Sequence, residues 1–169
     1  MNITPIPAFS DNYIWMIAHE GRAAVVDPGD PTPVLKTLEE QGLALDTIII
    51  THHHFDHTGG VSALKKATGC RVIGPDNPKI ADIDETMTEG ARVTVLGYGF
   101  EIMEVPGHTL DHIAYYNAED GTLFCGDTLF VGGCGRVFEG TFPMMQQSLA
   151  KLSHLPSETE VYCTHEYTM

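Results

Sequence analysis

The stretch Thr51-His-His-His-Phe-Asp-His-Thr-Gly-Gly60 decides the fold, because it places metal-binding side chains directly behind a buried strand. The run before it, Asp46-Thr-Ile-Ile-Ile50, is apolar and β-branched, which is typical of a strand buried on both faces. Imidazole and carboxylate groups are ligands for zinc and similar divalent metals. Open α/β sheets bind ligands at the carboxyl ends of their strands. The motif therefore predicts metal ligands at a strand end, namely His52, His54, Asp56 and His57.

The spacing within this motif predicts that its ligands serve two centres. His52 and His54 alternate, so continued strand geometry would point both to the same side. Asp56 and His57 follow on the turn, where the chain can direct them to a second centre. His53 should face away from its two neighbours.

Three later positions share the placement of the motif at the end of a predicted strand, beside small or turn-forming residues. They are His108 in Val105-Pro-Gly-His-Thr109, Asp127 in Phe124-Cys-Gly-Asp-Thr128 and His165 in Cys163-Thr-His-Glu-Tyr167. His112 lies where it can support such a site from behind.

Seven candidate ligands exceed the four that a single tetrahedral zinc needs, and two metals sharing one carboxylate account for the number. We expect His52, His54 and His108 to hold one metal, and Asp56, His57 and His165 to hold the other. Asp127 would bridge the two ions, which sit roughly 3.5–4 Å apart in such sites and can hold a hydroxide between them. Zinc is the expected metal, and iron or manganese also suit these ligands. Because no Gly-x-Ser-x-Gly motif occurs, the predicted chemistry is metal-assisted hydrolysis.

Composition narrows the class of protein. The 169 residues suit one domain, and a hydrophobic content of 43% is enough for a sizeable core. Nine basic against 23 acidic residues give a net charge of −14, which argues against nucleic acid as a partner. There is neither an apolar stretch long enough to span a membrane nor a visible signal peptide, so we expect a soluble cytoplasmic protein. The four cysteines form no Cys-x-x-Cys pair and are expected to be reduced.

Hydrophobic periodicity and turn residues predict an alternation of strands and helices. Helices are expected at Pro31–Gln41, Gly60–Thr68 and Phe142–Leu155. Strands are expected at 3–6, 13–17, 23–26, 46–50, 71–74 and 160–163. Two hairpins are expected, 91–96 with 100–105 across Gly97–Gly99, and 113–116 with 122–125. The segment from Pro75 to Glu89 shows no clear period and is interpreted as a surface excursion.

The pattern His-x-His-x-Asp-His, with the later His, Asp and His, resembles the metallo-β-lactamase superfamily. That resemblance implies an α/β fold, a four-layer αββα sandwich with the metals at one edge of its two sheets. Three further segments resemble the hydroxyacylglutathione hydrolase (glyoxalase II) family: Phe9-Ser-Asp-Asn-Tyr-Ile-Trp15, Gly126-Asp-Thr-Leu-Phe130 with Gly132-Gly-Cys-Gly-Arg-Val-Phe-Glu-Gly-Thr141, and His165-Glu-Tyr-Thr168.

This resemblance implies hydrolysis of the thioester S-D-lactoylglutathione to glutathione and D-lactate, by attack of a metal-bridging hydroxide. Asp56 and Asp127 would be the catalytic carboxylates, and Asp56 would also orient the hydroxide. Arg136 lies where the family has a basic residue that contacts the glycine carboxylate of glutathione. Phe138 stands where many members have tyrosine, so one hydroxyl contact is expected to be absent. Tyr167 aligns with a tyrosine of the glutathione pocket.

The resemblance covers nearly the whole chain as one catalytic domain, residues 1–169, truncated at the C-terminus relative to the family. Members continue with a further helix and a helical domain that carries basic glutathione contacts. His165, so near the last residue, is open to fraying. Two alternatives remain on the sequence alone: a related lactonase or β-lactamase-type hydrolase, and a domain that binds metal without catalysis.

Overall fold

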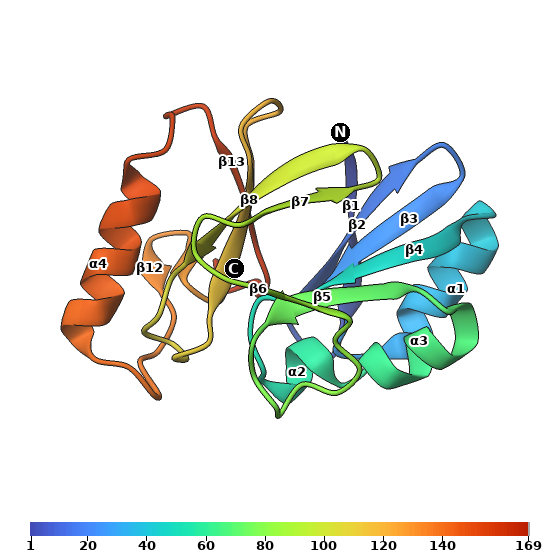
Figure 1. The fold of residues 1–169 in the computed structure, drawn as a ribbon, viewed down its shortest axis with the longest axis horizontal. Coiled ribbons are helices and arrows are strands. Elements are labelled where there is room, and N and C mark those ends of the chain that lie inside the picture. The colour runs from blue at the N-terminus through green and yellow to red at the C-terminus, as the bar shows by residue number, and fades with distance from the viewer. Residues whose placement is uncertain (169) are drawn as a thin grey trace.

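The computed structural model describes residues 1–168, which form two large sheets, a two-stranded ribbon and four helices (Figure 1). The helices are α1 (Pro31–Gln41), α2 (Phe55–Thr58), α3 (Val61–Thr68) and α4 (Phe142–Ser153). The strands are β1 (Asn2–Ala8), β2 (Asn12–His19), β3 (Arg22–Val26), β4 (Ala44–Ile49), β5 (Arg71–Pro75), β6 (Glu85–Met87), β7 (Arg92–Val95), β8 (Tyr98–Glu104), β9 (Ile113–Asn117), β10 (Thr122–Gly126), β11 (Leu129–Phe130), β12 (Gly133–Cys134) and β13 (Glu160–Cys163).

The first sheet contains β1 to β6 in chain order, and the second has the order β13-β10-β9-β8-β7. Strands β1 to β3 pair antiparallel, whereas β3 to β6 pair parallel, so α1 and α3 cross between parallel neighbours. In the second sheet only β10 and β13 are parallel. Strands β11 and β12 form a small separate ribbon.

The two sheets pack face to face, with helices on both outer faces. Figure 1 shows α1 and α3 covering the first sheet and α4 covering the second. Three buried apolar clusters fill the spaces between the layers. Successive residues of β4 serve different clusters, because Ile48 packs toward the helices and Ile49 toward the second sheet. The expected αββα sandwich is confirmed.

Local sequence signals set the helix ends. Asp30 caps α1 by accepting a hydrogen bond from the amide of Thr32, and Gly42 ends it in the left-handed conformation at φ 64°. The side chain of Thr141 caps α4 in the same way, by accepting from the amide of Met144. Helix α1 therefore begins and ends at the residues expected from the sequence.

The C-terminal segment is bound to the loop between β1 and β2. The amide of Tyr13 donates to the carbonyl of Thr164 at 2.7 Å, and the amide of Glu166 donates to the carbonyl of Asp11 at 2.8 Å. The indole of Trp15 also donates to the carbonyl of Cys163 at 2.8 Å. His165 is therefore fixed by backbone pairing on both of its sides, which is the opposite of the expected fraying.

Two details of the predicted elements are wrong. The segment from Pro75 to Glu89 contains a short strand, β6, and buries Ile80 and Met87, because it adds a parallel edge to the first sheet. In the first hairpin the turn lies at Leu96-Gly97 rather than Gly97–Gly99, because Leu96 takes φ 52° and Gly97 φ 84° and Tyr98 already pairs with Val95. The one-turn helix α2 was not predicted, because four residues show no period.

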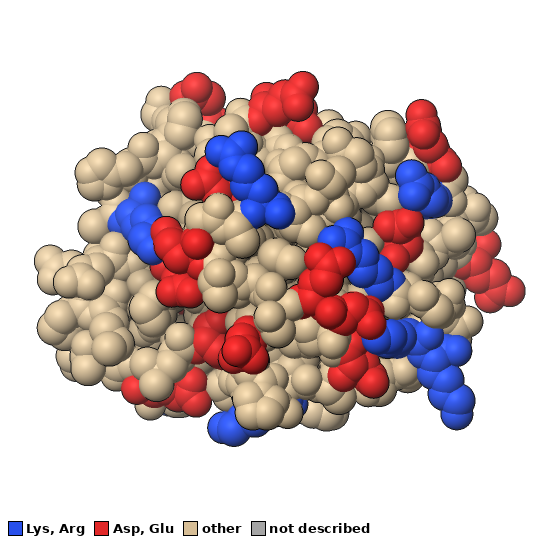
Figure 2. Space-filling model, viewed as in Figure 1, with Lys and Arg blue, Asp and Glu red and all other residues tan. Residues whose placement is uncertain are grey.

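Acidic and basic side chains are interspersed on the face shown in Figure 2. Lys65, Arg71 and Lys151 pair with Asp84, Glu85 and Glu89, at 2.7, 2.9 and 3.1 Å. Across residues 1–168, no helix combines the length and apolar character needed to cross a bilayer.

Candidate metal centre and adjoining pocket

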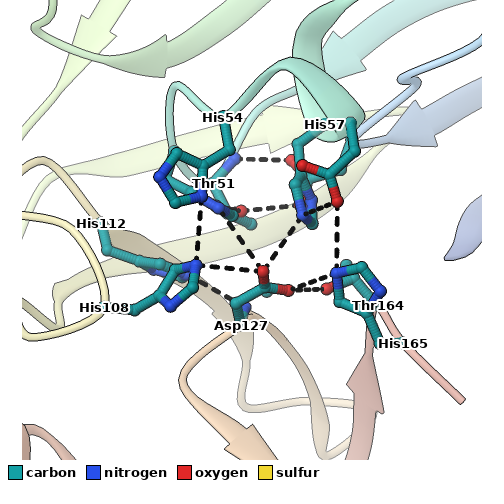
Figure 3. Close-up of polar contacts among 12 residues, drawn as sticks. Thr51, His54, His57, His108, His112, Asp127, Thr164 and His165 are labelled. Carbon is teal, nitrogen blue, oxygen red and sulfur yellow. Dashed lines mark hydrogen bonds and ion pairs between the residues drawn. The ribbon is translucent and has the colours of Figure 1, made fainter. Parts of the chain in front are cut away.

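The seven predicted ligands meet at one edge of the sandwich, on loops that follow β4, β8, β10 and β13 (Figure 3). His52 and His57 are completely buried, and His108, Asp127 and His165 are 5–7% exposed. Asp56 and His57 lie on α2, and this single helical turn brings them together, with the His57 ring 4.2 Å from the ring of His52 between their centroids. Residues distant in the sequence thus converge on a common point.

Asp127 lies at the middle of the cluster. Its Oδ2 atom lies 3.7 Å from Nε2 of His52, and 3.2 Å from Nε2 of both His57 and His108. Its Oδ1 atom lies 3.3 Å from Nε2 of His165. The carboxylate therefore reaches histidines of both predicted triads.

The candidate ligands fall into two groups around this carboxylate. One ligand atom from each of His52, His54, His108 and Asp127 lies within 4.8 Å of the others, and the same holds for Asp56, His57 and His165. In the second group, Oδ2 of Asp56 lies 3.2 Å from Nε2 of His57 and 3.3 Å from Nε2 of His165. The structure thus brings the members of each predicted triad close together, and a further group of Asp27, His52 and His57 connects the two.

Unsatisfied nitrogen atoms show that the cluster suits metal ions. Nε2 of His52 and Nε2 of His57 are buried and have no hydrogen-bond partner within residues 1–168. A buried polar atom without a partner costs about 1–3 kcal/mol, which a bound cation would remove. The donor set of imidazoles and carboxylates is one that divalent metals prefer.

Hydrogen bonds behind the rings fix which nitrogen faces the centre. Asp27 is 2% exposed and accepts from the Thr51 amide at 2.8 Å and the Thr51 hydroxyl at 2.6 Å. The Thr51 oxygen is then free to accept from Nδ1 of His52, at 2.9 Å. Asp27 also accepts from Nδ1 of His57 at 3.0 Å. These contacts hold a proton on Nδ1 of both histidines and so leave Nε2 as the nitrogen that would bind a metal ion.

The second group is supported in the same manner. Nδ1 of His165 lies 3.0 Å from Oδ1 of Asp11, and the side-chain amide of Asn12 donates to Oδ2 of Asp56 at 3.0 Å. The hydroxyl of Thr164 donates to Oδ1 of Asp127 at 2.5 Å. These supporting groups were not predicted. The available signal was weak: Thr164 directly adjoins His165, whereas Asp11 and Asn12 lie just before and at the start of β2, far from the predicted ligands in the sequence.

His112 supports the centre from behind, as its position in the sequence suggests. Its Nε2 accepts from the amide of Asp127 at 3.1 Å, and its ring stacks on His52 with centroids 4.5 Å apart. Burial lowers the pKa of His112 to about 3, so the ring is neutral. Gly126 makes this approach possible, because a Cβ atom there would lie 2.6 Å from Cε1 of His112.

Neighbouring charges and burial shift the pKa values of the side chains in the cluster. Burial raises the pKa of Asp127, but the charge of His57 and contacts with His108 and His165 outweigh it and hold the pKa well below its usual range. Burial lowers the pKa of His165, but contacts with Asp127 and Asp56 raise it to about 10. Burial lowers the pKa of His52 well below its ordinary value. The carboxylates therefore stay ionised at neutral pH.

An open pocket adjoins the centre and contains the three predicted substrate contacts. It has a volume of ≈ 370 Å³ and is lined by His108, Asp127, Phe130, Cys134, Gly135, Arg136, Phe138 and Tyr167. Tyr167 stacks on His165 with an interplanar angle of 4°, and the Arg136 guanidinium lies 5.6 Å from the centre of the Phe138 ring. A second opening of ≈ 500 Å³ exposes Asp56, His54 and His165. The predicted contacts and ligands thus share one accessible region.

Comparison with known proteins identifies the family. The model of the metallo-beta-lactamase superfamily matches residues 8–165. A hydroxyacylglutathione hydrolase of Ectopseudomonas mendocina is 58% identical over 172 aligned positions, covering 100% of this chain and 67% of that protein. The chain thus spans about two thirds of the length of this relative.

Solved structures agree with this assignment. ETHE1 from Myxococcus xanthus superposes with a TM-score of 0.88 at 32% identity, covering 99% of this chain and 77% of that one. TTHA1623 in a di-iron-bound form superposes with a TM-score of 0.83 at 27% identity, covering 98% and 92%. Within residues 1–168, the donors of one edge form a divalent metal site. The chain belongs to the metallo-beta-lactamase superfamily, and its curated relatives there are named hydroxyacylglutathione hydrolase.

Proposed function

We propose that this chain hydrolyses glutathione thioesters, converting S-D-lactoylglutathione to glutathione and D-lactate. The observation that carries the proposal is the position of Asp127 between two groups of metal-binding side chains, beside an open pocket that contains Arg136. The curated relatives named hydroxyacylglutathione hydrolase support this choice of substrate.

Two divalent metal ions are part of the proposal. His52, His54 and His108 would hold one ion, Asp56, His57 and His165 would hold the other, and Asp127 would be shared. Zinc is the favoured metal, while iron and manganese suit the same donors. The di-iron-bound form of the similar TTHA1623 supports a two-metal arrangement. When bound, such ions supply a water-derived nucleophile near neutral pH and polarise the thioester carbonyl.

The carboxylates of the chain perform the positioning in this reaction. Asp56 is about 40% exposed, and its Oδ2 atom is held by Asn12, so one face of the carboxylate is open to a substrate or water. Asp56 would orient the attacking water by accepting a hydrogen bond from it. Asp127, with its low pKa, remains an anion throughout and holds the two halves of the site together.

The pocket side chains would bind the glutathione moiety. Arg136 is exposed and has the charge and planar geometry that suit a carboxylate of the peptide. Phe138, which is 59% exposed, and Tyr167, which is 58% exposed, form apolar walls near the centre. Only Tyr167 of these two offers a hydroxyl for a polar contact.

A cytoplasmic location is also proposed. Cys70, Cys125, Cys134 and Cys163 are all free thiols in the structure. Free cysteines and a soluble peptide thioester substrate suit the reducing cytoplasm.

The test is a steady-state assay with S-D-lactoylglutathione, with metal analysis of the same sample. Turnover with about two metals per chain is the expected result for a two-metal thioesterase. Parallel assays with a lactone and a β-lactam separate the related hydrolases, which would turn over those substrates in preference to the thioester. Two bound metals without turnover of any of the three would contradict the proposed activity and leave a metal-binding domain.

A further inference from the structure

A second polar network lies on the far side of the histidine motif, and it begins at His53. The ring is about 10% exposed and contacts two carboxylates through different nitrogens. Nδ1 lies 3.0 Å from Oδ1 of Asp111, and Nε2 lies 3.5 Å from Oε2 of Glu139. His53, Asp111 and Glu139 lie close enough to hold an ion, but the two carboxylates face opposite nitrogens of the ring, and one ion cannot bind both nitrogens. We therefore interpret this ring as a bridge between two loops.

The two carboxylates come from the two loops that border the pocket. Asp111 belongs to the loop between β8 and β9, and its Oδ2 atom accepts from the side-chain amide of Asn77 at 3.0 Å. Glu139 belongs to the loop between β12 and α4, and its Oε1 atom accepts from the amide of Leu110 at 3.0 Å. His53 therefore links the histidine motif to both loops at once.

Backbone contacts place the Glu139 loop along the His108 loop. The amide of Phe138 donates to the carbonyl of His108 at 3.3 Å, and the amide of Gly140 donates to the carbonyl of Gly107 at 3.1 Å. Nδ1 of His108 lies 2.7 Å from the carbonyl oxygen of Arg136. The first of these bonds is long, and the contacts of Glu139 with Leu110 and His53 add two side-chain links to the same loop.

The Glu139 loop also carries the proposed substrate contacts. Arg136 and Phe138 precede Glu139 by three residues and one residue, and the Phe138 ring meets the rings of His54 and His108 at centroid distances of 5.7 and 5.3 Å. A shift of this loop would move both contacts relative to the metal centre. His108 takes one contact from this loop, at the Arg136 carbonyl, whereas the supports of His57, Asp127 and His165 lie outside it.

We propose that Glu139 and His53 are positioning residues that hold the Arg136–Phe138 segment over the metal centre and thereby set the affinity for substrate. This inference rests on the proposed thioesterase function for the identity of that substrate. The network acts on binding more than on the chemical step, because neither side chain faces the Asp127 carboxylate.

The kinetic test compares Glu139→Ala, Glu139→Gln and, as a control, Glu39→Ala, which removes an exposed carboxylate on α1. Glu139→Ala should raise KM for S-D-lactoylglutathione about fivefold, with kcat within about twofold and with unchanged metal content. Glu139→Gln keeps an acceptor for the Leu110 amide and should restore KM to within about twofold of the original protein. Glu39→Ala should leave both parameters unchanged. An unchanged KM in Glu139→Ala, or a fall in kcat with loss of metal, would overturn the positioning role.

Hydrogen exchange of the metal-loaded protein tests the same role without activity. In Glu139→Ala the amides of Phe138 and Gly140 should exchange faster, by about tenfold, whereas the amides of Thr51 and Asp127 should keep their rates. Equal rates in both proteins would refute the inference. If the original protein shows no thioesterase activity, the proposed function fails, and the exchange rates alone decide whether Glu139 fixes the loop.

Discussion

The backbone amide of Asp127 donates its hydrogen bond to Nε2 of His112, a neutral ring that is itself stacked on His52. One buried histidine thus sets the position of the shared carboxylate and of one metal-binding ring together. Since Nε2 accepts this bond, the ring proton resides on Nδ1, close to the hydroxyl of Thr128 at 3.5 Å.

Replacing His112 by alanine should weaken both the fold and the metal site. The change leaves the buried Asp127 amide without an acceptor and opens a cavity beside His52, so we expect a loss of about 2–4 kcal/mol in the free energy of unfolding. Metal affinity should fall by about 10–100-fold. Urea denaturation and competition with a chelator measure the two effects. His154→Ala is the control, because that ring is exposed and lies outside the cluster; a similar loss there would remove the special role of His112.

Asp27→Asn should impair the site while keeping its shape. Asp27 accepts from Nδ1 of His57 and from two groups of Thr51. An amide nitrogen in place of one oxygen would face a donor, which favours the wrong tautomer of His57 or turns the ring. We expect about a 10–100-fold weaker metal affinity, measured by chelator competition. Asp46→Asn, at a half-buried position of β4 that pairs with Arg22 outside the cluster, should bind metal normally. Full affinity in Asp27→Asn would show that this contact does not orient the ring.

Metal binding should become tighter as the pH rises. In the metal-free protein the pKa of His165 lies at about 10, above its ordinary value of 6.5, and the pKa of His57 is also raised. An incoming ion must therefore displace protons at neutral pH, and the logarithm of the apparent affinity should increase by about one or more per pH unit between roughly pH 7 and pH 9. Calorimetry in buffers of different ionisation enthalpy counts the released protons. Binding without proton release would contradict this.

The same shift has the opposite effect on the stability of the metal-free protein. A raised pKa means that the folded state holds the proton more tightly than the unfolded chain. The contribution of His165 to stability is therefore complete below about pH 6.5 and disappears as the pH rises through about 10. Thermal unfolding of metal-free protein across this range should show a midpoint that falls with pH.

Gly126→Ala should disrupt the centre through the backbone. Gly126 has φ 53°, and an added Cβ would lie 2.6 Å from both Cε1 of His112 and Oγ1 of Thr51. Strain and collision together should cost about 2–4 kcal/mol and displace Asp127. Gly132→Ala is a matched control, because it shares a positive φ of 73° but has open space around it. Denaturation of both variants should show the larger loss at Gly126.

Phe138→Tyr tests the pocket wall. The ring is 59% exposed and stands at the rim, so an added hydroxyl meets solvent or substrate without steric cost. We expect a modestly lower KM for the glutathione thioester, by about two- to threefold, with unchanged kcat. An unchanged KM would remove Phe138 from the binding surface.

The sequence predicted the metal-binding groups because their signal is local. The alternation of His52 and His54, and the turn that carries Asp56 and His57, are properties of six adjacent residues. The supporting partners could not be predicted in this way. Asp27 contacts His57 across 30 positions, and Asp11 contacts His165 across 154. Such pairs depend on strand order, which the sequence pattern leaves open. For the same reason the short edge strand β6 was missed.

The pairing of Thr164 with Tyr13 also bears on how the chain folds. His165 and the Asp11 carboxylate that supports it are 154 positions apart, so the site joins segments that are distant in the sequence. Contacts of such high contact order form late, because they close a long loop. During synthesis on a ribosome, β13 has to emerge before the second group of ligands is complete. Metal uptake should consequently follow the docking of the segment after β13 onto the loop between β1 and β2, and its rate reports on that step.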